Sequence, residues 1–195
     1  MKEFEKLSIV LASASPRRAQ LLELAGFKFK IRTREVDESY PSDLSPGEIA
    51  AFLAVKKANA QKDMMENADE IILAADSVVV LGNTILGKPQ SREEAFTMIN
   101  ALSGKSHEVI TGVCLYSNDK QEVFSNISKV YMDKLTEAEI AYYIDNYKPY
   151  DKAGSYGIQE WIGLTRIIGI EGSYSNIMGL PMHAIYEKLQ LFILR

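Results

Sequence analysis

Cysteine is nearly absent from this sequence of 195 residues, which contains Cys114 and no other. A single cysteine excludes an internal disulfide framework and a zinc site built from several cysteines. Histidine is almost as scarce, with His107 and His183, so a histidine-rich metal cluster is excluded as well. The longest apolar runs are short, such as residues 71–75, and no apolar stretch before Ser13 is long enough to suggest a secretory signal. These absences predict a cytoplasmic protein that does not associate with a membrane.

Charge of one sign does not dominate, because 22 Lys and Arg residues are balanced by 26 Asp and Glu residues, for a formal net charge of -4. General nucleic-acid binders usually carry a basic surface, so we expect no nucleic-acid partner. A few local basic side chains are nevertheless enough to bind one nucleoside triphosphate. With 12 Gly, 6 Pro, 47% apolar and 25% charged residues, the composition is that of a globular protein, not of a linker or a collagen.

Short apolar runs alternate with segments of helical periodicity, which predicts the α/β class, in a single domain over residues 1–195. Strands are expected at residues 7–12, 27–34, 70–75, 77–81 and 165–170, and on both sides of a hairpin turn at residues 117–120. Helices are expected from Pro16 to a stop at Gly26, and at residues 45–62, 91–102, 136–147 and 181–194. Three helix starts pair a hydroxyl residue with a glutamate three residues later: Ser45 with Glu48, Ser91 with Glu94, and Thr136 with Glu139.

Two basic segments are candidates for binding phosphate. The first is the turn Ser13-Ala14-Ser15-Pro16-Arg17-Arg18, because helix-start N–H groups and guanidinium groups both bind phosphate oxygens. The same turn could instead be a plain helix cap with two solvated arginines. The second is Gly87-Lys88-Pro89, where the lysine would neutralise phosphate or simply be exposed in a turn. Its spacing does not match a P-loop.

Asp76 follows a buried apolar run, and we expect it at a strand end, where ligands commonly bind in α/β proteins. Such a carboxylate can hold Mg²⁺ or activate water, or it can be an ordinary turn aspartate. Asp37 and Glu38 belong to an acidic stretch that could complete an all-oxygen metal site with Asp76, or could form a solvated face. Lys56 and Lys57 share the second expected helix, and one of them is expected to point toward the ligand.

The glycine-containing segment 152–159 ends in Gln159, whose amide offers a donor and an acceptor for a base edge. The alternative for this segment is an irregular strand with a bulge. His107 is expected at a strand start in a structural role, and Cys114 as a buried packing thiol. No serine or cysteine stands out as a nucleophile, so covalent catalysis is not expected.

Six segments in order resemble the Maf family of nucleoside triphosphate pyrophosphatases, and the resemblance covers residues 11–185. They are Leu11-Ala12-Ser13-Ala14-Ser15-Pro16-Arg17-Arg18, Ala75-Asp76-Ser77, Gly87-Lys88-Pro89, Leu102-Ser103-Gly104-Lys105-Ser106-His107, Asp151-Lys152-Ala153-Gly154-Ser155-Tyr156-Gly157-Ile158-Gln159 and Asn176-Ile177-Met178-Gly179-Leu180-Pro181. The resemblance implies an elongated mixed β-sheet flanked by helices, with two lobes around a nucleotide-binding cleft. It also implies hydrolysis of a nucleoside triphosphate to monophosphate and pyrophosphate, a divalent metal cofactor (Mg²⁺ or Mn²⁺) and a homodimer.

The resemblance further implies roles for individual residues. Asp76 matches the catalytic aspartate, as a proton acceptor or a metal-linked activator of water. Asp37 matches the acidic position on the metal side of the site, and Glu38 is its neighbour. The positions implied to bind or select the substrate are Ser13, Arg17, Ser77 and Gln159, with Lys57 and Lys88 facing phosphate.

Gln159 favours the subgroup that acts on dTTP and UTP, because its amide can pair with the O4 and N3 edge of these pyrimidines. Two positions depart from the family pattern: Ser77 stands where threonine is usual, and Glu160-Trp161 follows Gln159 where many members have glycine. Two alternatives stay open. One is the sister subgroup that acts on modified guanine nucleotides such as 7-methyl-GTP, and the other is a non-enzymatic regulator of septum formation.

Overall fold

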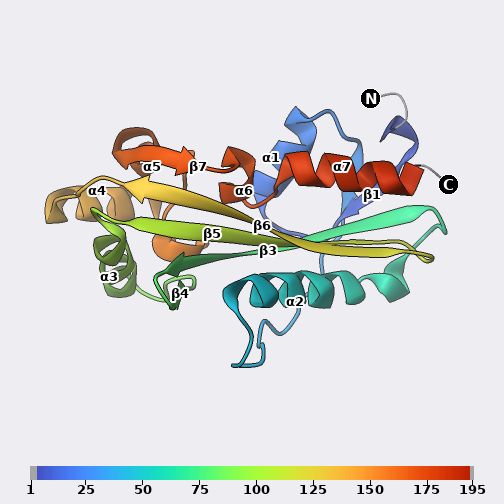
Figure 1. Cartoon of the computed structure of the whole chain (residues 1–195), viewed down its shortest axis with the longest axis horizontal. Helices are drawn as coiled ribbons and strands as arrows, with labels where there is room; N and C mark the ends of the chain where they lie inside the picture. The colour runs from blue at the N-terminus through green and yellow to red at the C-terminus, as the bar shows by residue number, and fades with distance from the viewer. Residues whose placement is uncertain (1–3, 194–195) are drawn as a thin grey trace. The chain divides into compact units, whose positions relative to one another are not determined.

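Seven strands form one mixed β-sheet in the computed structural model, which describes residues 4–193 (Figure 1). The strands are β1 (Ser8–Leu11), β2 (Phe29–Ile31), β3 (Glu70–Leu81), β4 (Thr84–Leu86), β5 (Ser106–Tyr116), β6 (Gln121–Met132) and β7 (Ile167–Glu171). Their order is β2-β1-β3-β5-β6-β7, and β4 pairs with β3. The helices are α1 (Pro16–Leu24), α2 (Pro46–Asn59), α3 (Arg92–Leu102), α4 (Glu137–Tyr147), α5 (Trp161–Arg166), α6 (Tyr174–Ile177) and α7 (Met182–Ile193), with 3-10 turns at Phe4–Lys6, Lys62–Met64 and Ala153–Ser155. The prediction of a mixed sheet flanked by helices is confirmed.

The chain divides into two compact units. The first contains Met1–Asp76, Thr111–Asn126 and Gly179–Arg195, and the second contains Ser77–Ile110 and Ile127–Met178. Strands β3, β5 and β6 therefore each contribute residues to both units. The first unit also holds β1, β2, α1, α2 and α7, and the second holds β4, β7, α3, α4, α5 and α6.

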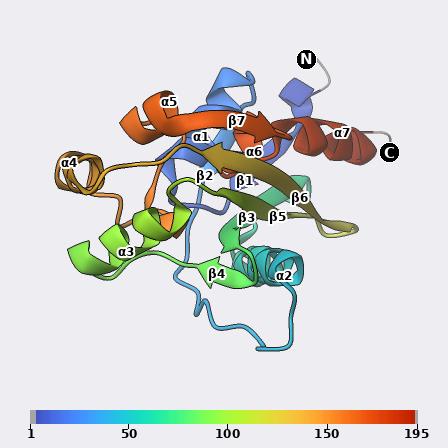
Figure 2. The ribbon, with the colours of Figure 1, turned by 60° about the vertical axis from the view of Figure 1, so that its left-hand side comes forward.

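Helices lie on both faces of the sheet in the first unit, with α2 on one face and α1 and α7 on the other (Figures 1 and 2). Strand β1 runs parallel to β2 and to β3, as crossover connections through helices require. Because both faces are covered, Ile9, Val10 and Leu11 are all buried, and the strand shows no polar alternation. A core cluster of mostly small residues joins α2 to β3 and β5: Ala12, Ala54, Ala58, Ile72, Ala74 and Cys114.

Helix α3 packs against α4 in the second unit, and both helices begin where the sequence predicts. The hydroxyl of Ser91 accepts a hydrogen bond from Glu94 N at the start of α3. Thr136 and Glu139 form a complete capping box at the start of α4. Ser45 and Glu48 make the equivalent box at α2 in the first unit, so all three predicted helix starts are confirmed.

Strand β3 runs without a break past Asp76, so the prediction that this residue ends a strand is wrong. The two apolar runs on either side of it form one strand because its half-buried carboxylate is paired with Lys57. Thr165 was expected in a strand but belongs to α5, where its hydroxyl donates to the carbonyl of Trp161. The strand that follows starts two residues later, at Ile167.

Other differences concern element ends and short helices. The strand expected at residues 27–34 covers only Phe29–Ile31, and the helix expected to reach residue 62 ends at Asn59. The helix Tyr174–Ile177 was not expected, since four residues give too little periodicity to detect.

His107 and Cys114 are both buried in β5, as predicted. His107 Nε2 lies 2.6 Å from the hydroxyl of Tyr156, while its Nδ1 has no hydrogen-bond partner among the described residues. Burial lowers the pKa of His107 from 6.5 to about 4, and it raises the pKa of the Cys114 thiol to about 11. The imidazole is therefore neutral at pH 7, and the thiol is not a nucleophile there.

The buried His107 should make the free energy of unfolding depend on pH. The folded state binds its proton less tightly than the unfolded chain, so stability is complete above about pH 6.5 and falls as the pH decreases toward 4. We expect a loss of about 2 kcal/mol between pH 7.5 and pH 5 from this group. Urea unfolding at both pH values should show a smaller loss in His107→Phe. The control His183→Gln alters a histidine that is 83% exposed and should keep the wild-type loss. An equal loss in all three proteins would contradict this assignment.

Candidate active site

Arg18 connects the basic turn of the first unit to the sheet. Its Nε donates to the carbonyl of Gly179 at 2.9 Å, and its Nη1 donates to the carbonyl of Ala75 at 2.7 Å and to Ser13 Oγ at 3.1 Å. Ser13 Oγ also accepts the backbone N–H of Ser15 at 3.2 Å. The half-buried guanidinium of Arg18 therefore fixes the turn before α1 against β3.

Arg17 follows Pro16 at the start of α1 and is half-buried. The side chain of Ser15 makes no capping hydrogen bond to this helix. Burial lowers the pKa of Arg18, and the negative charge of Asp76 acts in the opposite direction. The turn thus combines a helix N-terminus with two guanidinium groups, which is a suitable environment for phosphate.

Lys57 joins two of the predicted acidic residues. Its ammonium group is bonded to Asp76 Oδ1 and lies 2.8 Å from Glu38 Oε1. The side chains of Lys57 and Asp76 are only 18% and 14% exposed, whereas that of Glu38 is 48% exposed. Lys56 pairs instead with Asp37, so Lys57 is the helix lysine that contacts Asp76 and Glu38. The structure brings Lys57 into contact with Asp76 and Glu38, two carboxylates that the sequence suggested for one site.

Asp37 lies in the exposed loop before α2 and has partners of its own. Its carboxylate accepts hydrogen bonds from the N–H of Ser39, at 3.0 Å, and from the Ser39 hydroxyl. Lys56 Nζ donates to Asp37 Oδ2 at 3.1 Å. The bonds from Ser39, and then from Lys56, lower the pKa of Asp37 to about 2. Asp37 therefore contacts Ser39 and Lys56, whereas Asp76 and Glu38 contact Lys57.

The carboxylates of Asp76 and Glu38 converge on one cationic group, the Lys57 ammonium. Mg²⁺ is commonly bound by one or two carboxylates while substrate phosphates supply further oxygens. Among residues 4–193, no group of three or more His, Cys, Asp or Glu side chains is placed to hold a metal ion. Asp76 and Glu38 are thus a pair of carboxylates whose oxygens suit a divalent cation.

Two of the predicted motifs meet in the second unit. The carbonyl of Gly87 accepts the N–H of Gly154 at 3.0 Å, which joins the turn Gly87-Lys88-Pro89 to the segment 151–159. Gly154 has a φ of +69°, and a Cβ there would lie 3.0 Å from a methyl group of Val79 in β3. Glycine therefore allows this segment to approach β3 closely. Lys88 is exposed in the turn.

Gln159 lies just before α5 in the second unit and is half-buried. Its Oε1 atom is buried and has no hydrogen-bond partner within residues 4–193. An unsatisfied buried acceptor of this kind costs about 1–3 kcal/mol, which a ligand donor would offset. Ser77, the residue after Asp76 in β3, is also half-buried.

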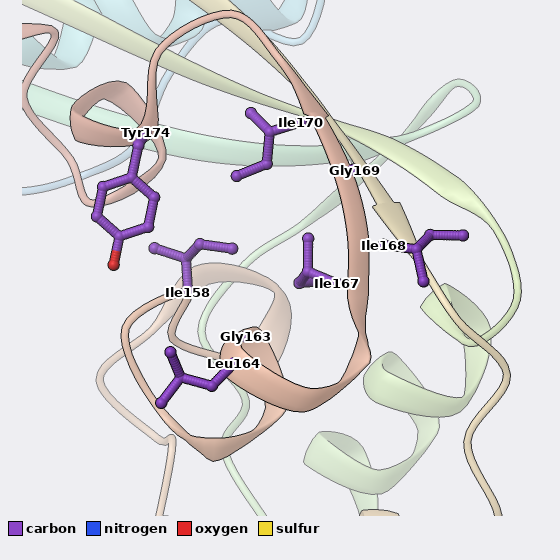
Figure 3. Close-up of a pocket in the computed structure, with 8 residues that line it drawn as sticks. All are labelled: Ile158, Gly163, Leu164, Ile167, Ile168, Gly169, Ile170 and Tyr174. Carbon is purple, nitrogen blue, oxygen red and sulfur yellow. The ribbon is translucent and has the colours of Figure 1, made fainter.

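A hollow of about 260 Å³ lies beside β7 in the second unit (Figure 3). Ile158, Leu164, Ile168 and Tyr174 are among the residues that line it, and none of the lining side chains is charged. It therefore offers nothing to neutralise a triphosphate, and we do not assign phosphate binding to it.

The family model described as Maf-like protein matches residues 8–192, nearly the whole chain. The chain belongs to the Maf-like family. A relative named dTTP/UTP pyrophosphatase from Bacteroides thetaiotaomicron is 47% identical to this Maf-like chain, covering 95% of it and 96% of the relative. Another with the same name, from Parabacteroides distasonis, is 47% identical over 98% of this chain and 100% of the relative. Among solved structures, the Ham1 protein of Staphylococcus aureus matches 64% of this chain and 71% of its own, with 14% identity and a TM-score of 0.45.

Sequence reasoning on this Maf-like chain missed the anchoring role of Arg18. Successive helix residues point about 100° apart, so Arg17 and Arg18 leave the helix in different directions. The doubled arginine was the only signal, and it does not tell which of the two bonds to the protein.

Proposed function

We propose that this protein hydrolyses dTTP and UTP to the nucleoside monophosphate and pyrophosphate. The relatives named dTTP/UTP pyrophosphatase support the substrates, since they match the chain at 46–47% identity over nearly its whole length. The observation that carries the reaction is the contact of Asp76 and Glu38 with Lys57. Arg18 bonds to the carbonyl just before Asp76, so the basic turn before α1 is joined to β3 next to this carboxylate.

In the proposed reaction a water molecule attacks the α-phosphorus. A bond forms between the water oxygen and phosphorus, the bond from phosphorus to the bridging oxygen breaks, and pyrophosphate leaves with the electron pair. Asp76 accepts the proton that the water gives up. Lys57, Lys88 and Arg17 are the cationic groups that we assign to the phosphates, and Ser13 is assigned to the same turn as a hydroxyl donor.

Asp76 and Glu38 are the residues that would hold the divalent cation, Mg²⁺ or Mn²⁺, with Asp37 as a further predicted ligand. Such a cation neutralises charge on the departing pyrophosphate. Lys57 keeps the carboxylates of Asp76 and Glu38 at one place, so they are positioned before substrate arrives.

The proposed base selection uses the amide of Gln159. Uracil and thymine present an acceptor at O4 and a donor at N3, which match the amide Nε2–H and Oε1. The buried, unsatisfied Oε1 of Gln159 supports this role. Ser77, adjacent to Asp76, is the second position that we assign to substrate selection.

Partners and location follow the same proposal. We propose a nucleotide and not a nucleic acid as the partner, a homodimer, and a cytoplasmic location. Among residues 4–193, no helix is both long enough and apolar enough to cross a bilayer.

Pyrophosphate release by the purified protein tests the proposed function. With Mg²⁺ or Mn²⁺, we expect kcat/KM for dTTP and UTP to exceed that for CTP, GTP, ATP and 7-methyl-GTP at least ~10-fold, which corresponds to the loss of about one net hydrogen bond. Preference for 7-methyl-GTP would keep the chemistry and overturn the role of Gln159. No release from any nucleotide would overturn the proposal and favour the binding alternative.

A further inference from the structure

The Gln159 amide poses a specificity problem that its own chemistry does not solve. Rotating the amide by 180° exchanges its donor and its acceptor. Cytosine presents the reverse of the uracil pattern, with a donor at N4 and an acceptor at N3. An amide that can rotate or shift would therefore bind cytosine as well as uracil. Selection of dTTP and UTP over CTP therefore depends also on how firmly the surrounding backbone holds Gln159 in place.

Glu160, the next residue, lies at the centre of a buried polar network in the second unit. Its Oε2 accepts a hydrogen bond from the hydroxyl of Tyr143, and its Oε1 lies 3.1 Å from Lys152 Nζ. The Lys152 side chain is 9% exposed and that of Glu160 is 19% exposed, while Tyr143 is fully buried. The network links three points of the fold: α4, the segment 151–159 and the start of α5.

The same network holds the backbone on both sides of Gln159. The hydroxyl of Tyr143 accepts the N–H of Gly157 at 2.9 Å, and Glu160 N donates to the carbonyl of Gly157 at 3.1 Å. A Cβ at Gly157 would lie 2.8 Å from Glu160 Cδ, so the carboxylate packs directly on this backbone. A Cβ at Gly163 would lie 1.9 Å from the carbonyl oxygen of Ile158, so α5 also packs on the segment.

We propose that Glu160 is a positioning residue for base selection, which joins Tyr143 to Lys152 and thereby fixes the backbone that carries the Gln159 amide. This inference rests on the proposed function. Glu160 is assigned no contact with the nucleotide; it acts through the backbone of residues 157–160. A carboxylate suits the position because it accepts from a hydroxyl and an ammonium group at once.

The variant Glu160→Gln tests the proposal, because an amide keeps the size of the side chain but presents an NH₂ donor to either Tyr143 or Lys152. We expect the ratio of kcat/KM for dTTP to that for CTP to fall at least ~10-fold, with CTP hydrolysis rising in absolute terms. Tyr143→Phe removes the shared hydroxyl and should lower the ratio in the same direction. The double variant should lower it no further than the more affected single variant, since both changes free the same backbone.

Asp145→Asn is the matched control. It also changes a carboxylate on the second unit to an amide, but Asp145 forms an exposed ion pair with Arg92 and belongs to no part of the network. Its dTTP to CTP ratio should equal that of the wild type. Thermal unfolding of each variant shows whether it is folded. If Glu160→Gln does not fold, the Tyr143→Phe variant alone tests the proposal.

The outcomes separate this inference from the proposed function. A wild-type enzyme that prefers dTTP, with a Glu160→Gln variant that loses activity on dTTP and CTP in equal proportion, overturns the inference alone and makes Glu160 a packing residue. A wild-type protein without activity on any nucleotide overturns both. A lowered ratio with raised CTP hydrolysis supports both.

Discussion

Changing Asp76 to asparagine should lower kcat for dTTP about 1000-fold, within the 10²–10⁴ range that a general base contributes. Asparagine keeps the size of the side chain and an acceptor for the Lys57 ammonium, but it cannot take a proton from water. It is also a weaker ligand for a divalent cation than a carboxylate. The variant should remain folded, because the carboxylate of Glu38 still pairs with Lys57 at 2.8 Å.

Pyrophosphate release under single-turnover conditions measures this effect on the chemical step. Asp63→Asn is the matched control, since Asp63 is a carboxylate of the same unit that pairs with Arg34 on the surface. It should keep the wild-type rate. If Asp76→Asn retained more than about a tenth of the wild-type kcat while folded, Asp76 would not be the proton acceptor.

Features whose residues lie close together in the sequence could be predicted from it. The basic turn from Ser13 to Arg18 and the turn around Lys88 each carry their signal within a few residues. Capping pairs such as Thr136 with Glu139 are equally local, and the structure confirms them. The family could be recognised because several such local segments occur in a fixed order.

Contacts between distant segments could not be predicted in the same way. Lys57 and Asp76 are 19 residues apart, and the packing of α2 on the sheet brings the ammonium to the carboxylate. The bond from Tyr143 to Glu160 depends likewise on the placement of α4 against the start of α5. Asp76 looked like a strand end because a charge interrupts an apolar run. Its partner on another element, which sequence does not show, lets it stay inside β3.

In the first unit, small side chains determine how closely α2 packs against β5. Ala50, Ala54 and Ala58 recur every four residues on α2 and are all completely buried. They form one stripe of small side chains along the helix. Gly112 lies opposite this stripe on β5, and a Cβ there would lie 2.2 Å from the carbonyl carbon of Ala50 and 2.3 Å from the nitrogen of Ala51. Lys57 is on the same helix, so this packing distance also positions the ammonium group that contacts Asp76.

Gly112→Ala should therefore be strongly destabilising. The new methyl group would meet backbone atoms of Ala50 and Ala51, which cannot rotate aside, so α2 must shift or β5 must bend. We expect a loss of about 3 kcal/mol or more in the free energy of unfolding and a Tm lower by about 10 °C. Adding Ala50→Gly should not restore the Tm, because the clash is not with the Ala50 side chain.

Gly47→Ala provides the control for this prediction. Gly47 lies in the first turn of α2, and a Cβ there would meet no atom within 4 Å. Alanine is a better helix former than glycine, so the Tm of this variant should be unchanged or slightly higher. Differential scanning calorimetry of both variants measures the difference. A Gly112→Ala protein with the wild-type Tm would mean that α2 can move away from β5 without cost, and Lys57 would then not be held rigidly at Asp76.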